Sequence, residues 1–174
     1  LTEEATLRVV RYLLLVPNGI AAMSMDIPGL VQTSCNLGIF HVADGVLTAV
    51  SSVRSSVASQ KQMLLARFAD ALAQLLGGSL HVTGAYPAWE YRRESALREK
   101  MAAVYEQQTG KAPKIEAIHA GLECGLFAGQ LPGLDCVSFG PDLVDIHTAR
   151  EKMSISSVQR TWKFLLGVLE ALKD

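Results

Sequence analysis

The chain has 174 residues, of which 49% are hydrophobic and 19% are charged; this excludes a disordered chain and suits one domain or two small ones. Sixteen Lys and Arg residues nearly balance 17 Asp and Glu residues. No basic stripe is present that would neutralise a phosphate backbone, so we expect no nucleic-acid partner. The apolar stretches are broken by Gly, Pro or charge well short of the roughly 20 residues of a membrane helix, so we expect a soluble protein without a membrane partner.

The cysteines indicate a cellular compartment. Cys35, Cys124 and Cys136 form no CxxC pair, and an odd number of cysteines without a secretory signal argues against a disulfide framework. We therefore expect a reducing, cytoplasmic location. The chain opens with LTEEATLRVV, which has no initiator Met and already lies inside a helical pattern, so we expect a piece of a longer polypeptide.

The first predicted element is a helix over residues 3–15. Thr2 can cap it, Glu3 and Glu4 place negative charge in its first turn, and Pro17 ends it. An antiparallel hairpin follows. Asp44-Gly45 provides its tight turn, and VLTAVSSVRS its second strand. The alternation of the first strand places these residues on one face: Val31, Thr33, Cys35, Leu37 and Ile39.

A second helix is predicted at about 57–76, because apolar residues recur there at helical spacing, and Gly77-Gly78 stops it before a strand at about 79–86. Helix, hairpin, helix and strand make a two-layer α+β unit. The aromatic segment GAYPAWEYRR is the predicted join to a second domain. We place the domains at 1–88 and 89–174.

The second domain is predicted to have the order helix, strand, helix, strand, helix, which is typical of an α/β domain with a parallel sheet. Its first helix spans about 94–109 and ends at Gly110. KIEAIHA and LDCVSFG are the two strands, and a loop continues to about 154. Ser156 and Gln159 resemble a capping box at the start of a last helix with a strongly apolar face.

Polar residues gather after the two strands of this domain, in HAGLECG and in SFGPDLVDIHTARE. Ligands of open α/β sheets bind at the carboxyl ends of strands, so both segments are candidates for a site. His147 lies in a loop near Asp142, Asp145 and Glu151, where a neutral imidazole could bind a metal or act as an acid or base. The alternative is a solvated loop histidine.

HAGLECG itself has several interpretations. Glu123 could hold a substrate amine or support a metal ligand, or it could be a helix N-terminal carboxylate. Gly121 and Gly125 would let a ligand approach the backbone, but they could equally be turn residues. We expect His119 to be a hydrogen-bonded core histidine, and Cys124 to be an inert small hydrophobic residue rather than a nucleophile.

Two residues of the hairpin are further candidates. Arg54 ends a strand in SSVRSS, and its planar guanidinium suits a carboxylate, although it could be an ordinary surface arginine. Asn36 could contact a ligand or make a strand hydrogen bond.

Taken in order, VQTSCNLGIF, VRSS, AYPAWEY, AIHAGLECGLF, SFGPDLVDIH and SISSVQRTWKFLLGVLEAL resemble the carboxy-terminal part of the aminoacyl-histidine dipeptidases. These are also called peptidase D or bacterial carnosinases, and they belong to the di-zinc metallopeptidases that include carnosinases and aminoacylases. The resemblance implies a catalytic α/β domain that carries two metals, with an inserted α+β lid that mediates dimerisation. Residues 1–88 correspond to part of the lid, and 89–174 to the final segment of the catalytic domain.

The resemblance also implies roles for five residues. His147 matches the last zinc ligand, Arg54 the lid arginine that grips the substrate carboxylate, and Asn36 the lid asparagine near the substrate or oxyanion. Glu123 and Gly125 match positions that line the dipeptide pocket.

The sequence departs from the family pattern in one loop. HTARE stands where H[ST]P[DN]E is usual: Ala149 and Arg150 replace the Pro and the acidic or amide residue, whereas Glu151 aligns. The ligand is kept, but the rigidity of its loop is not assured by sequence.

The function implied for the complete protein is hydrolysis of Xaa-His dipeptides by a metal-activated water, with zinc as the metal and cobalt or manganese as substitutes. The family's other zinc ligands and its general-base glutamate have no counterpart in this chain, so no catalytic residue is assigned here and we expect the chain alone to be inactive. A homodimer through the lid is implied. The alternative is a non-catalytic dimerisation or ligand-binding module.

Overall fold

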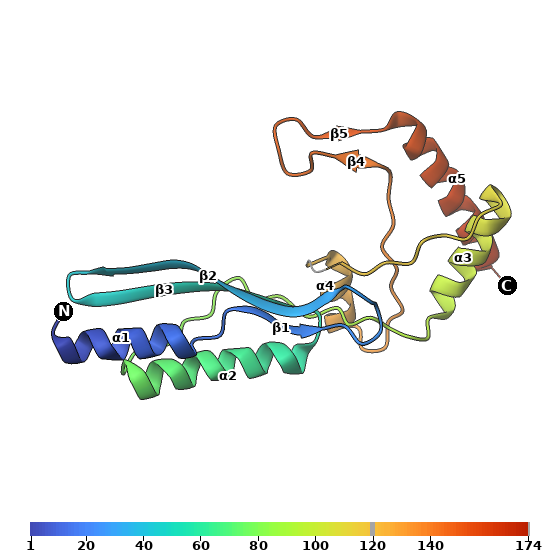
Figure 1. The fold of residues 1–174 in the computed structure, drawn as a ribbon. Helices are drawn as coiled ribbons and strands as arrows, with labels where there is room; N and C mark the ends of the chain where they lie inside the picture. Colours follow the sequence, from blue (N-terminus) through green and yellow to red (C-terminus); the bar gives the residue numbers. More distant parts are fainter. Residues whose placement is uncertain (119–120, 174) are drawn as a thin grey trace. The chain divides into compact units, whose positions relative to one another are not determined.

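A computed structural model describes residues 1–118 and 121–173 (Figure 1). Its contacts define two units. The first comprises Leu1–Tyr91 with Glu116–Gln130, and the second comprises Arg92–Ile115 with Leu131–Asp174. No helix of the described residues is both long enough and apolar enough to cross a membrane.

The first unit begins with helix α1, Glu3–Leu15. Thr2 Oγ1 accepts a hydrogen bond from the Ala5 backbone nitrogen at 3.2 Å, and Glu3 and Glu4 stand in the first turn. These groups satisfy and complement the free N–H groups of the helix start, so the predicted cap is confirmed.

An antiparallel sheet follows, in the order β1-β2-β3. Its strands are β1 (Gly19–Met23), β2 (Val31–Ala43) and β3 (Val46–Ser55). Asp44 and Gly45 join β2 to β3 with φ values of 51° and 76°, and positive φ at both central residues is the mark of a tight hairpin turn. The predicted hairpin is confirmed; β1 lies in a segment that the sequence had indicated only as a connection.

A β-bulge at Gly38 changes which face β2 presents. Leu37 pairs with Ser51 and Ile39 with Val50, so Gly38 is an extra residue with no partner on β3. Cys35 is 4% exposed, whereas Ile39 is 52% exposed. The prediction that Ile39 shares the face of Cys35 is therefore wrong, and Phe40 takes the place against the core.

Helix α2, Ala58–Leu75, lies with α1 beneath the sheet (Figure 1). The helices and the sheet bury a common core that consists of Tyr12, Val16, Cys35, Leu64 and Phe68. Burial of such side chains contributes about 1.5–3 kcal/mol each, so this cluster holds the hairpin in place. Helix α4, Glu123–Gln130, also belongs to this unit.

The second unit is built on two helices, α3 (Ala96–Thr109) and α5 (Ile155–Ala171). They bury Met101, Val104 and Val168. Gly110 ends α3 with φ 70°, as predicted. Ser154 caps α5 by accepting from the Ser157 nitrogen, so the predicted capping box at Ser156 is wrong by two residues.

A short antiparallel pair, β4 (Leu143–Val144) and β5 (Lys152–Met153), lies in the segment that was predicted to be a loop. The predicted strands at 79–86 and 134–140 are absent, as is the described part of the one at 114–120. Every strand in the described part of the chain pairs antiparallel. The predicted parallel sheet is thus wrong for these residues. A segment forms a strand only where a neighbouring strand pairs with it. The mixed α and β composition is as predicted.

Candidate functional site

Arg54 and Asn36 lie on the face of the sheet that is turned away from the core. Arg54 pairs with Ser34, and Asn36 pairs with Ser52, so the two side chains are diagonal neighbours on adjacent strands. Such neighbours are roughly 7–8 Å apart. Both are exposed, and the sheet therefore presents a cation and an amide together on one surface.

The strand end that carries Arg54 is fixed by buried hydroxyl groups. Ser55 Oγ lies 2.8 Å from Thr33 Oγ1 and accepts from the Val57 nitrogen at 3.0 Å. Thr33 is fully buried, and its hydroxyl also donates to Gln60 Oε1. This network joins β2, β3 and the start of α2, and it holds the backbone on either side of Arg54.

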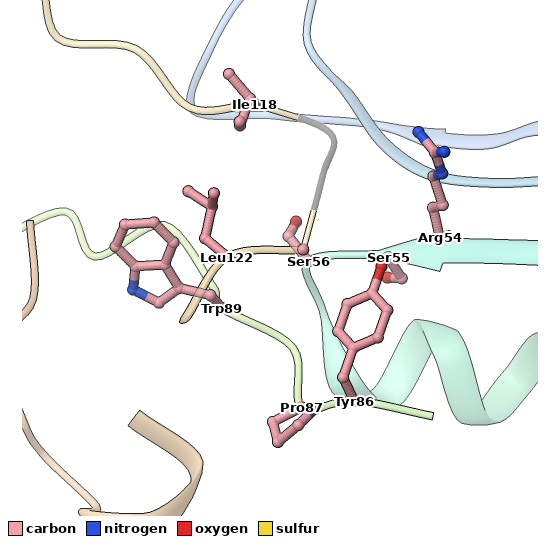
Figure 2. A pocket seen from close by; sticks show the side chains of 9 residues that line it. Arg54, Ser55, Ser56, Tyr86, Pro87, Trp89, Ile118 and Leu122 are labelled. Atoms are coloured by element: carbon pink, nitrogen blue, oxygen red, sulfur yellow. The ribbon is translucent and has the colours of Figure 1, made fainter. Parts of the chain in front are cut away.

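Arg54 also borders a small pocket with a volume of about 20 Å³, which is room for about one water molecule (Figure 2). Every residue around it belongs to the first unit. The pocket is lined by Arg54, Ser55, Ser56, Tyr86, Pro87, Trp89, Ile118, Gly121 and Leu122. The guanidinium of Arg54 offers a partner for a carboxylate, but the pocket beside it is far smaller than the roughly 300 Å³ of a ligand pocket.

Gly125 has a packing role that the structure explains. A Cβ on this buried residue of α4 would lie 3.0 Å from the Pro87 carbonyl oxygen and 3.4 Å from Trp89 Cβ. The missing side chain therefore lets the segment with Pro87 and Trp89 lie close against the helix. Its role as a substrate contact stays a prediction.

Glu123 is the first residue of α4, where a carboxylate interacts favourably with the free N–H groups of the helix. It is exposed, so the argument that a buried carboxylate needs a partner does not apply to it. Cys124 is half-buried. His119, which was predicted to be a core histidine, lies outside the described residues.

His147 lies in the second unit, in the loop between β4 and β5. Its backbone has φ 64°, which is uncommon for a residue other than glycine. Its backbone nitrogen donates to Glu151 Oε2 at 3.0 Å, and the Thr148 hydroxyl accepts from the Arg150 nitrogen at 3.1 Å. The HTARE loop is thus held by its own hydrogen bonds without the proline of the usual pattern.

The residues present do not form a complete metal site. Within residues 1–118 and 121–173, no three His, Cys, Asp or Glu side chains lie close enough together to hold a metal ion. A catalytic zinc generally has three protein ligands. The exposed His147 could supply one nitrogen and no more.

Sequence reasoning missed Tyr86 and Trp89, which form much of the pocket wall. The signal was present in AYPAWEY, where aromatic residues interrupt a polar join. Aromatic side chains in a loop are a stronger indication of binding than the same residues in a helix face, because no periodicity assigns them to a core.

No family model matches the chain. The cytosol non-specific dipeptidase of Escherichia coli K12 is 34% identical to it over 163 residues, which are 94% of this chain and 33% of that protein. The crystal structure of aminoacylhistidine dipeptidase from Vibrio alginolyticus superposes with a TM-score of 0.88 at 34% identity, and covers 98% of this chain and 34% of that one. Aminopeptidase PepT from Bacillus cereus shares the fold, with a TM-score of 0.76 at 18% identity over 97% of this chain and 45% of that one.

The chain therefore spans about a third of the length of the dipeptidases that it matches. Both similarities run along nearly the whole of the chain, and the mixed α and β fold is that of the solved relative. Over that third, the chain is a homologue of the aminoacylhistidine and cytosol non-specific dipeptidases, as the resemblance in its sequence indicated.

Proposed function

We propose that the chain is part of a metal-dependent dipeptidase that hydrolyses Xaa-His dipeptides in the cytoplasm. The observation that carries the proposal is its similarity, at 34% identity and a TM-score of 0.88, to a protein described as aminoacylhistidine dipeptidase. The cytosolic name of the Escherichia coli relative supports the location.

In this proposal residues 1–88 belong to a lid and dimerisation domain, and 89–174 to the catalytic domain. The pocket then has lid residues such as Arg54 and Tyr86 on one side and the catalytic segment with Gly121 and Leu122 on the other. Segments of both proposed domains then meet within the first unit, as is expected where a lid adjoins a catalytic domain.

Arg54 binds the terminal carboxylate of the dipeptide, because a guanidinium fork matches the two carboxylate oxygens. Asn36, a diagonal neighbour on the same face, donates from its amide to the substrate carbonyl oxygen, where negative charge develops during amide hydrolysis. Glu123 and Gly125, which follow the pocket residue Leu122 in the chain, are assigned to the dipeptide site of the complete protein.

The metal is zinc, two ions in the complete site, with cobalt or manganese as substitutes. His147 contributes one ligand. Since the described residues hold no three-ligand cluster, the proposal assigns the remaining ligands and the general base to other parts of the complete protein. The 174-residue chain alone is then inactive.

The test is release of free histidine from a panel of Xaa-His dipeptides, with bound zinc counted, by the complete protein that carries this chain. We expect His147→Ala to lose part of the zinc and at least about 100-fold in kcat/KM, since even residues that only support a ligand are worth 10–100-fold. His81→Ala, in an exposed loop, is the matched control and should change neither value. A His147→Ala variant that keeps its zinc and its rate would remove His147 from the metal site.

A second candidate is a dimerisation or ligand-binding module without chemistry. It predicts a complete protein that is a dimer by light scattering but is inactive and free of metal. Hydrolysis by the wild-type protein excludes it, whereas hydrolysis by the isolated chain would contradict the assignment of ligands to other parts of the protein.

A further inference from the structure

Thr33 and Ser55 are opposite residues of β2 and β3, and their hydroxyl groups meet on the core side of the sheet. Thr33 is fully buried and Ser55 is half-buried, whereas Arg54, the neighbour of Ser55 on β3, is exposed. Successive side chains of a strand point to opposite faces of the sheet. The hydroxyl pair therefore lies behind the strand position from which the Arg54 side chain projects.

The two hydroxyl groups belong to a chain of hydrogen bonds. Gln60 Oε1 can only accept, so it receives the single hydroxyl proton of Thr33. Ser55 Oγ accepts from the Val57 nitrogen at 3.0 Å. Its own proton lies between Thr33 Oγ1 and the Val57 carbonyl oxygen, which are both 2.8 Å away. Neighbouring hydrogen bonds in such a chain polarise one another, so the loss of one member weakens the rest.

This hydroxyl chain connects the three elements that meet beside Arg54. Thr33 belongs to β2, Ser55 ends β3, and Gln60 stands in the first turn of α2. A guanidinium binds both oxygens of a carboxylate only in a fixed fork geometry. A small rotation of the last residues of β3 would therefore misdirect the Arg54 fork.

We propose that Thr33 is a positioning residue, which orients Arg54 toward a substrate carboxylate by way of the hydroxyl chain. This rests on the proposed function, because it takes Arg54 to bind that carboxylate. Thr33 is itself buried, so it acts only through other residues. Its contribution is to substrate binding, and it is therefore expressed in KM rather than in kcat.

The experiment uses the complete protein that carries this chain. For each variant kcat and KM are measured on Ala-His, and the affinity for Ala-His is measured by calorimetry after a chelator has removed any metal. Thr33→Val replaces the hydroxyl by a methyl group, and Thr33→Ser keeps the hydroxyl. Thr48→Val is the matched control, since it makes the same change at a half-buried residue toward the start of β3.

A second pair of variants interrupts the hydroxyl chain at its other end. Gln60→Met removes the acceptor from a half-buried helix position, where a substitution disturbs the fold less than at the fully buried Thr33. Gln62→Met, at an exposed position of the same helix, is its matched control. Unfolding midpoints are recorded for every variant, so that a loss of folding is recognised.

We expect Thr33→Val to raise KM and to weaken the binding of Ala-His by roughly 3- to 10-fold, which is the range for the loss of one hydrogen bond. Its kcat stays within about twofold of the wild type. Gln60→Met has an effect in the same direction. Thr33→Ser and the two control variants stay within about twofold of the wild type in both constants.

An Arg54→Lys background separates positioning from a general loss of stability. Lysine keeps the positive charge, but it carries this charge on a flexible stem without the planar fork, so its binding depends less on the orientation of the strand. We expect Thr33→Val to raise KM by less than about twofold in this background. An equal rise in both backgrounds would show that Thr33 only stabilises the fold.

The outcomes distinguish this inference from the proposed function. A wild type that hydrolyses Ala-His, with an unchanged KM in Thr33→Val, would overturn the role of Thr33 and leave the dipeptidase assignment standing. A wild type that binds Ala-His without hydrolysing it would overturn the proposed function. The role of Thr33 then stands if Thr33→Val weakens this binding with Arg54 present but not in the Arg54→Lys background, and falls otherwise. A wild type that neither hydrolyses nor binds Ala-His overturns both.

Discussion

Asp135 shows how a single carboxylate organises the second unit. It accepts from Ser95 Oγ at 2.7 Å and from the Leu97 nitrogen at 3.1 Å, at the first turn of α3. Burial raises the pKa of Asp135, but these hydrogen bonds and the charges of Arg92 and Arg98 together lower it by more. The net pKa lies below its usual value, so the ionised form stabilises the fold.

The sign of the pH dependence follows from that depressed pKa. Above the unfolded-state pKa of about 3.9 the ionised Asp135 contributes its full stabilisation, and this is lost as the pH falls through the lower pKa of the folded state. We expect Asp135→Ala to lower the free energy of unfolding by about 1 kcal/mol at pH 7. Chemical denaturation from pH 7 to pH 2 should show this difference shrinking below about pH 4. A difference that stayed constant over the range would show that the carboxylate charge is not involved.

At the scale of the element, the bulge at Gly38 decides which β2 side chains face the core. Deleting Gly38 removes the extra residue, and regular alternation then keeps both Cys35 and Phe40 on the core face, opposite Val53 and Ala49. We therefore expect the deletion to change the free energy of unfolding by less than about 1 kcal/mol. Urea denaturation of the deletion variant measures it.

The control for this deletion is Gly38→Ala, which keeps the residue count. Its Cβ would lie 3.6 Å from Asn36 Nδ2 and 3.9 Å from the Val50 carbonyl oxygen, which are ordinary contacts. We therefore expect this variant to change the free energy of unfolding by less than about 1 kcal/mol. A loss of roughly 2–3 kcal/mol in the deletion variant alone would mean that β2 requires the extra residue.

The elements with local signals are those that the sequence predicted well. Thr2, the Asp44-Gly45 turn and Gly110 mark their boundaries with a few neighbouring residues, and the structure confirms each of them. The strands at 79–86 and 134–140 depended on unknown pairing partners, and they are absent. Periodicity cannot reveal the bulge either, since Ile39 and Phe40 are both apolar and either one could face the core.

At the scale of the whole molecule, the candidate site also contains residues that the sequence predicted and residues that it did not. Arg54 and Asn36 were predicted as separate residues, and the strand register places them on one face. Tyr86 and Trp89 reach the pocket through contacts between segments that are distant in sequence. The aromatic residues of AYPAWEY could be suspected from the sequence, but only the fold shows which distant segments they meet.

The isolated chain exposes an apolar stripe on α5. Trp162, Leu166 and Leu169 are 60%, 48% and 52% exposed, and they are spaced three or four residues apart, so they share one face of the helix. Large exposed apolar surfaces associate in water. We expect the 174-residue chain alone to have a mass above that of a monomer in multi-angle light scattering, with the mass rising with concentration.

Replacing Trp162 and Leu166 by Glu should shift this mass toward that of the monomer, because two charges on that face oppose burial. Replacing the exposed Met25 by Glu, outside the stripe, should leave the mass unchanged; the same decrease in this control would show that net charge, and not the α5 face, governs the association.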